Sequence, residues 1–301
     1  MYRPCEQETE GLPLEYIFEQ IGIWLKDVFV GGIENNISGM FDSVNAGVGR
    51  ISARMAETPE SFNPGIFTML KMISDNVILP VAGIILAFVM TLELIRMVME
   101  KNNMRDMDFL EFFKWIFKTA CAVILVSNTW NIVSGIFELS GSVVRSTAGL
   151  IRGSAAITLF ESRESLHAAL MAKEIPELLG IWLQTSVAGI AMWALSICIF
   201  LISYGRMIEI YLLTSVSPIP MAAVMADKRN IGGGYLRSLA ALGLQGFLII
   251  VCVAIYSALV QGIVLSSDIS GAVWTCMGYS VLLCFCLFKT GTLAKNIMGT
   301  Y

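Results

Sequence analysis

The fold of this chain is decided by Tyr204-Gly-Arg-Met-Ile-Glu-Ile-Tyr-Leu-Leu-Thr-Ser-Val-Ser-Pro-Ile-Pro-Met-Ala-Ala-Val-Met-Ala-Asp-Lys-Arg229. The stretch is almost wholly apolar and carries two prolines one residue apart, Pro218 and Pro220. These prolines remove two backbone donors and clash with the preceding turn, so a straight helix cannot continue through them. In hydrocarbon a broken helix persists only where protein or water covers the freed backbone groups. The stretch therefore predicts a broken, re-entrant element over residues 207–226, inside an assembled membrane protein.

The composition places the whole chain in the membrane class. Of 301 residues, 56% are hydrophobic and only 15% are charged, and the mean hydropathy is +0.71. Soluble domains have about a quarter of their residues charged. The composition and the long apolar runs predict an all-α polytopic membrane protein. We expect about five transmembrane helices, one Pro-broken re-entrant element and an N-terminal amphipathic helix.

Apolar runs and polar breaks divide the chain into three regions. Residues 1–76 form an N-terminal amphipathic, extracytoplasmic region, whose apolar stripe from Leu14 to Phe29 has helical spacing. This helix either lies flat at a membrane interface or packs on a neighbouring subunit, and Gly31-Gly32 is expected to end it. Residues 77–295 form the transmembrane domain, and residues 138–177 form its outer loop. The expected spans are residues 77–95, 119–137, 178–204, 238–264 and 269–288.

The topology depends on whether the broken element crosses the bilayer. If it returns to the side that it left, one face holds eleven of the twenty lysines and arginines, whereas a full crossing leaves that face six. The positive-inside rule favours the first arrangement. It predicts five spans, with the N-terminus outside and the C-terminus in the cytoplasm.

Charged residues near the break are the candidate functional residues. Arg206 and Glu209 lie one helical turn apart, so they either form a local ion pair at the interface or line a pore or proton site. Glu93 and Arg96 have the same spacing and are expected to pair at a membrane edge. The other candidates are Pro218 and Pro220 at the break and the basic pair Lys228 and Arg229 after it.

No catalytic motif is present in the sequence. A Walker loop and the motifs G-x-S-x-G and H-E-x-x-H are all missing. The single histidine, His167, is in a polar loop, and the seven cysteines include no C-x-x-C pair. We therefore expect no enzymatic activity, no cofactor and no metal, and any transport would draw its energy from partners or an ion gradient.

The residues around the break resemble those of the TrbL-like polytopic membrane subunits of type IV secretion systems. The resemblance is carried by Ser217-Pro218-Ile219, by the basic turn Asp227-Lys228-Arg229, and by Tyr235-Leu236-Arg237 leading into the next span. It extends over residues 77–295 through the plan of about five spans and a central outer loop.

The resemblance implies a non-enzymatic channel or scaffold subunit of a conjugal DNA transfer apparatus. Its implied partners are further copies of itself, other type IV secretion subunits, separate secretion ATPases and the lipid bilayer. Its implied cargo is relaxase-bound single-stranded DNA, although the sequence shows no basic–aromatic groove for such a strand. Two alternatives stay open: a small secondary transporter or permease that binds substrate at a broken helix, and a structural membrane scaffold.

Overall fold

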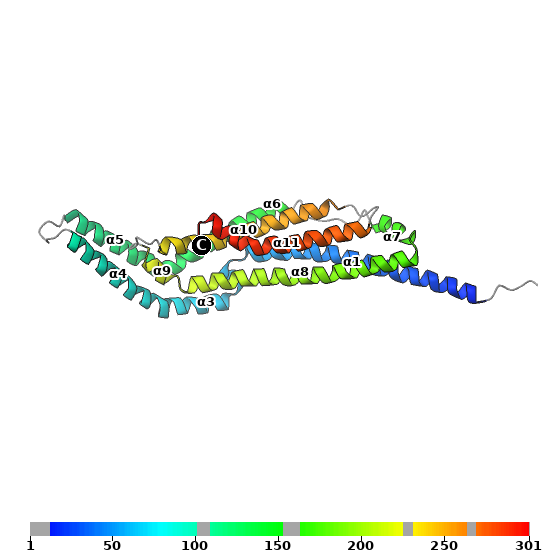
Figure 1. The fold of residues 1–301 in the computed structure, drawn as a ribbon. Coiled ribbons are helices and arrows are strands. Elements are labelled where there is room, and N and C mark those ends of the chain that lie inside the picture. Colours follow the sequence, from blue (N-terminus) through cyan, green and yellow to red (C-terminus); the bar gives the residue numbers. More distant parts are fainter. Residues whose placement is uncertain (1–12, 101–108, 153–162, 225–230, 264–268, 301) are drawn as a thin grey trace, which may run out of the picture. The chain divides into compact units, whose positions relative to one another are not determined.

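The computed structural model describes residues 13–100, 109–152, 163–224, 231–263 and 269–300 (Figure 1). Every regular element in these residues is a helix. In chain order they are α1 (Pro13–Ala56), α2 (Pro59–Phe62), α3 (Pro64–Ile73), the π-helical η1 (Ser74–Ile78), α4 (Leu79–Glu100), α5 (Phe109–Ser127), α6 (Thr129–Arg152), α7 (Arg163–Met171), α8 (Ile175–Ser215), α9 (Pro218–Ala222), α10 (Ile231–Gln261) and α11 (Ile269–Ile297).

Four helical segments are long and apolar enough to cross a membrane. They are Pro64–Met99, Ile175–Ser215, Ile231–Gln261 and Ile269–Ile297. These segments and the all-helical fold confirm an all-α polytopic membrane protein. The expected span at residues 119–137 is not among the four. It is divided between α5, which contains Glu111, Lys114 and Lys118, and α6, which begins at Thr129.

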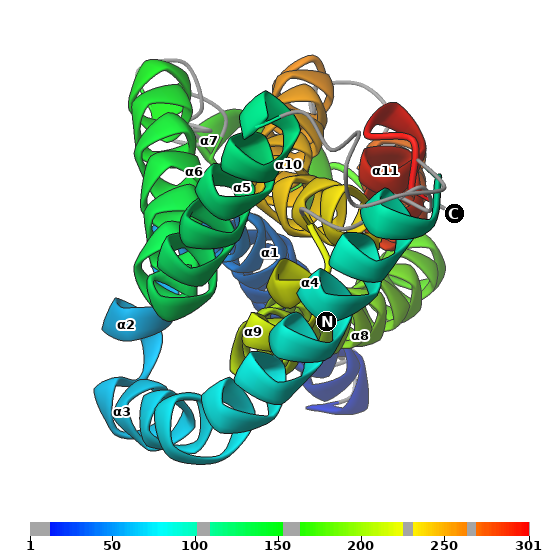
Figure 2. The ribbon, with the colours of Figure 1, turned by 90° about the vertical axis from the view of Figure 1, so that its left-hand side faces the viewer.

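The segment Pro64–Met99 is bent where α3 meets α4 (Figure 2). The π-helical turn η1 occupies the bend, and Pro80 follows it in the first turn of α4. A π-turn and a proline each disturb the regular backbone ladder, which accounts for the change of direction. The 22 residues of α4 would by themselves extend for roughly 33 Å, about the thickness of the hydrocarbon layer.

Helices continue past three of the boundaries expected from the sequence. Helix α1 continues through Gly31-Gly32. A Cβ on Gly32 would lie 2.9 Å from the indole Nε1 of Trp182, so this glycine allows close packing. Helix α8 continues to Ser215, although we expected the third span to end at residue 204 and the broken element to begin at 207. The expected outer loop at residues 138–177 contains the second half of α6 and all of α7.

The chain divides into two compact units. Unit 1 consists of residues 1–46, 156–195 and 259–281, and unit 2 consists of residues 47–155, 196–258 and 282–301. Helices α1, α8, α10 and α11 each contribute residues to both units. Both prolines of the break, and the charged pair Arg206 and Glu209, belong to unit 2.

Unit 2 has a core to which the broken stretch contributes directly. Helix α9 packs against both α4 and α5, which also contact each other (Figure 1). The buried residues of this core are Ala82, Leu86, Met90, Ala122, Val126, Val133, Phe137, Met207, Ile210, Tyr211, Met221, Ala222, Tyr235, Leu239 and Leu242. The break is thus enclosed by apolar side chains from α4, α5, α6, α8 and α10.

Side-chain contacts give the directions of the helices in unit 2. Arg206 and Leu213 of α8 contact Leu242 and Tyr235 of α10 respectively, so these two helices are antiparallel. Cys198 and Glu209 of α8 contact Cys284 and Lys295 of α11 respectively, so these two are parallel. The chain therefore leaves α8 and enters α10 at the same end of unit 2.

Candidate functional site

The break between α8 and α9 removes the usual helical donors from the carbonyls of residues 213–216, and three of these carbonyls accept from another group. We call residues 216–224 the break segment. Pro218 cannot donate to the carbonyl of Thr214, which instead accepts from the backbone N–H of Ser217 at 3.2 Å and from its hydroxyl at 2.7 Å. Pro220 cannot donate to Val216, whose carbonyl accepts from Ile219 at 3.1 Å.

The third carbonyl is satisfied from another helix. In a regular helix the N–H of Ser217 would donate to the carbonyl of Leu213, but here it donates to Thr214. The carbonyl of Leu213 instead accepts from the hydroxyl of Tyr235 on α10 at 2.9 Å. Buried carbonyls without partners are costly in hydrocarbon, so Tyr235 and Ser217 make the break tolerable there. The sequence predicted that protein would cover the break, but it did not identify Tyr235 as a residue that does so.

The break segment is closely packed. Ser217 and Ala222 are fully buried, Met221 is 2% exposed, and Pro218 is buried. Gly232, at the start of α10, allows the tightest approach, because a Cβ there would lie 2.1 Å from Cγ2 of Val224 and 2.9 Å from the carbonyl oxygen of Pro220. Gly232 is therefore a packing position.

Arg206 is a buried cation held mainly by α10. Its side chain is 5% exposed, its Nε donates to the carbonyl of Leu242 at 3.2 Å, and Nη1 lies 3.7 Å from Sδ of Met55 on α1. A Cβ at Gly246 would lie 2.7 Å from Nη2. Because Gly246 has no side chain, the guanidinium can reach the carbonyl of Leu242 one turn earlier.

The same turn of α10 receives a second polar side chain. Ser140 of α6 donates to the carbonyl of Gly243 at 2.8 Å, where the missing side chain again leaves the backbone accessible. Helices α6 and α8 therefore both attach to adjacent carbonyls of α10. Such side-chain bonds to backbone are a common way to join helices in a membrane.

The predicted local ion pairs are not formed. Glu209 accepts from Nζ of Lys295 at 3.0 Å, across to α11, rather than from Arg206. Likewise Glu93 of α4 pairs with Lys118 of α5 rather than with Arg96. In both cases the carboxylate pairs with a lysine on an adjacent helix. Residue spacing along one helix cannot predict such a pair.

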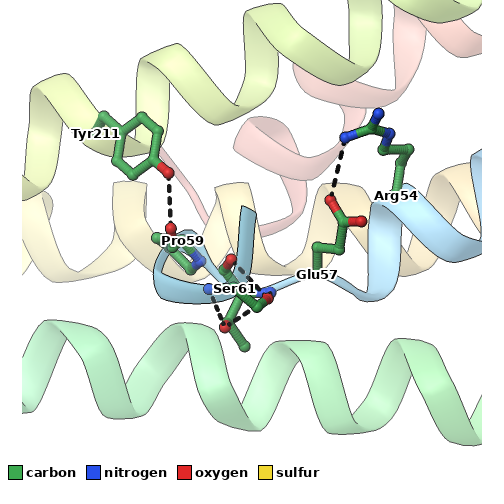
Figure 3. A network of polar contacts seen from close by, with 6 residues as sticks. Arg54, Glu57, Pro59, Ser61 and Tyr211 are labelled. Atoms are coloured by element: carbon green, nitrogen blue, oxygen red, sulfur yellow. Dashed lines mark hydrogen bonds and ion pairs between the residues drawn. The ribbon is translucent and has the colours of Figure 1, made fainter. Parts of the chain in front are cut away.

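The end of α8 lies beside α2, as Figure 3 shows. The hydroxyl of Tyr211 donates to the carbonyl of Pro59 at 2.6 Å, and the ring of Phe62 lies 5.2 Å from that of Tyr204, edge to face. Arg54 and Glu57 form an ion pair near this contact. We expected residues 1–76 outside and residue 204 at the cytoplasmic face. These contacts do not allow both placements.

Unit 1 contains an open groove between α1 and α8. Its volume is about 540 Å³. Asn36 is fixed in its wall by donating to the hydroxyls of Thr185 and Ser186 at 3.1 and 3.2 Å. The lining residues are mostly small or uncharged: Asn35, Asn36, Gly39, Met40, Ser43, Ser186, Gly189, Ile190, Met192 and Trp193.

The remaining candidates contribute less to this site. Lys228 and Arg229 lie outside the described residues. His167 bonds Glu34 of α1 through Nδ1 at 2.7 Å. Among the residues that the structure describes, no group of three or more histidine, cysteine or carboxylate side chains could hold a metal ion.

Comparison with protein families gives a match that reaches the first proline of the break. The family described as TrbL/VirB6 plasmid conjugal transfer like protein matches residues 44–218. Searches of curated proteins and of solved structures each find no match. The matched range begins near the end of α1, includes Arg206 and Glu209, and ends at Pro218. The TrbL-like resemblance of the sequence is confirmed, and the chain belongs to the TrbL/VirB6 plasmid conjugal transfer-like family.

Proposed function

We propose that the chain is a non-enzymatic channel or scaffold subunit of a type IV secretion apparatus for conjugal transfer. The observation that carries this proposal is the break between α8 and α9, where three freed carbonyls accept from Ser217, Ile219 and Tyr235. A helix broken and rebuilt in this way is typical of membrane proteins that line or support a pathway. Energy for transfer would come from separate secretion ATPases, and the cargo would be relaxase-bound single-stranded DNA.

Exposed aromatic side chains on unit 1 support assembly with other subunits. On α1, Tyr16, Phe18 and Trp24 are 67%, 70% and 63% exposed. Large exposed apolar surfaces indicate contacts with proteins or lipid. We propose that the chain forms a homo-oligomer in the bacterial inner membrane and binds further secretion subunits there.

A transfer assay tests the proposed function. Deleting the gene from the donor should abolish conjugation while solute uptake stays normal, and the wild-type gene should restore transfer. Normal conjugation after deletion would exclude the proposal, and lost uptake with normal conjugation would favour the permease.

A proline variant tests the role of the break. Pro218→Ala with Pro220→Ala restores two backbone donors and should lower transfer at an unchanged membrane level. Pro64→Ala is the matched control, because this proline occupies the first turn of α3, where no helical N–H bond is needed. Equal transfer by the double variant and the control would make the break incidental.

The orientation proposed is an N-terminus outside and a C-terminus in the cytoplasm. In unit 2, α1 runs parallel to α8, since Gly47 lies against Ile199 and Met55 against Arg206. With α8 running from the outside to the cytoplasm, as proposed, α1 also starts outside, and α2 lies at the cytoplasmic face beside the end of α8. Thiols introduced by Glu60→Cys and Arg237→Cys, both at exposed positions, should label from the cytoplasmic side. Labelling from opposite sides would contradict the contact between Tyr211 and Pro59.

A further inference from the structure

Three charged residues lie near the end of α8: Arg206, Glu209 and Lys295. Only Glu209 and Lys295 form an ion pair. The buried guanidinium of Arg206 contacts a carbonyl and a thioether sulfur, and no carboxylate of the described residues lies within ion-pair distance of it. A buried cation without a counter-charge is costly, especially within a membrane segment. A carboxylate within reach would therefore be a more favourable partner for Arg206 than its present contacts.

That partner is Glu209, one turn further along α8. Residues three apart on a helix point within about 60° of each other, and their side chains can meet. Glu209 is bound instead by Lys295 of α11. The side chains of this pair are 45% and 43% exposed, and ion pairs at such exposure are weak.

We propose that Arg206 and Lys295 compete for Glu209, which gives the end of α8 two arrangements. In the arrangement described above, Lys295 ties α8 to α11, while Arg206 ties α8 to the carbonyl of Leu242 on α10 and covers Met55. In the other, Glu209 accepts from Arg206, Lys295 is released, and α10 loses its tie at Leu242.

The exchange would act on the break segment. Helix α8 ends at Ser215, and the break segment follows it directly. The ties from Arg206 and Glu209 are therefore the last charged contacts of α8 before the break. Moving one guanidinium from α10 to Glu209 would change how firmly α8 and α10 are held together there, which is the kind of two-state contact that conformational switches use.

The thiol introduced by Met55→Cys reports which arrangement is present. Met55 is 2% exposed, and its sulfur lies 3.7 Å from Nη1 of Arg206. In an otherwise cysteine-free full-length chain in detergent, this thiol should react slowly with N-ethylmaleimide while Arg206 covers it. The assay needs no secretion, so its outcome is independent of the proposed function.

Four variants in this background decide the proposal. Lys295→Met should raise the labelling rate by about tenfold, because it frees Glu209 for Arg206. Lys289→Met, at an exposed position on the same helix, should leave the rate unchanged. Lys295→Met combined with Glu209→Gln should restore slow labelling, and Glu209→Gln alone should also label slowly.

Three results would overturn the exchange. An unchanged rate in Lys295→Met would show that Arg206 does not move. A fast rate that persists in the variant with Glu209→Gln would show that α11 has merely loosened. A fast rate in Lys289→Met would show that any lost charge on α11 has this effect. Size-exclusion profiles of all variants would establish that each is folded.

Discussion

The break segment in unit 2 and the groove in unit 1 differ in how closely their polar groups are surrounded by other residues. At the break, the carbonyls of Leu213, Thr214 and Val216 have new donors, and the side chains of Ser217, Pro218, Met221 and Ala222 are buried. At the groove, Asn36 is bonded, but the lining stays open over about 540 Å³. The comparison shows that the break is closely packed inside the protein. The groove is an open surface, where substitutions need not disturb packing.

The largest effect on stability is expected from adding one methyl group beside the break segment. Gly232→Ala places a Cβ 2.7 Å from Cα of Val224, a backbone atom that cannot move away cheaply. We expect a loss of roughly 3 kcal/mol in the free energy of unfolding, measured by denaturant titration in mixed micelles. Gly234→Ala is the control, because a Cβ there has no neighbour within 4 Å. Equal stability of the two variants would mean that the start of α10 does not pack on the break segment.

Removing one hydroxyl should have a smaller effect. Tyr235→Phe keeps the ring but leaves the carbonyl of Leu213 without its donor. Leaving a buried acceptor unsatisfied should cost about 1–2 kcal/mol, in the same titration. Tyr16→Phe, at a 67% exposed position of unit 1, should change nothing measurable. If Tyr235→Phe is also silent, the carbonyl has another donor and the break is less dependent on α10.

The smallest effect is expected in the groove. Gly189→Leu partly fills it, and a Cβ at Gly189 meets no atom within 4 Å. The free energy of unfolding should change by no more than about 0.5 kcal/mol. A large loss of stability would show that the groove is as closely packed as the break and would remove the contrast between the two regions.

The sequence alone was sufficient for the class of protein and for an interruption at the two prolines. Low charge and long apolar runs require a membrane protein, because such segments cannot be exposed to water. The pair Pro218 and Pro220 requires an interruption, since neither can donate a backbone hydrogen bond. These are local properties of composition and covalent structure, and no other part of the chain can change them.

Only the tertiary structure decided which residues complete the site. Lys295 takes Glu209 from 86 positions away, Tyr235 reaches back 22 positions to Leu213, and Gly246 makes room for Arg206. It also decided that α8 continues to Ser215 and that α1 passes through Gly31-Gly32. Each outcome depends on a close approach between segments far apart in sequence, which periodicity and spacing within one helix do not specify.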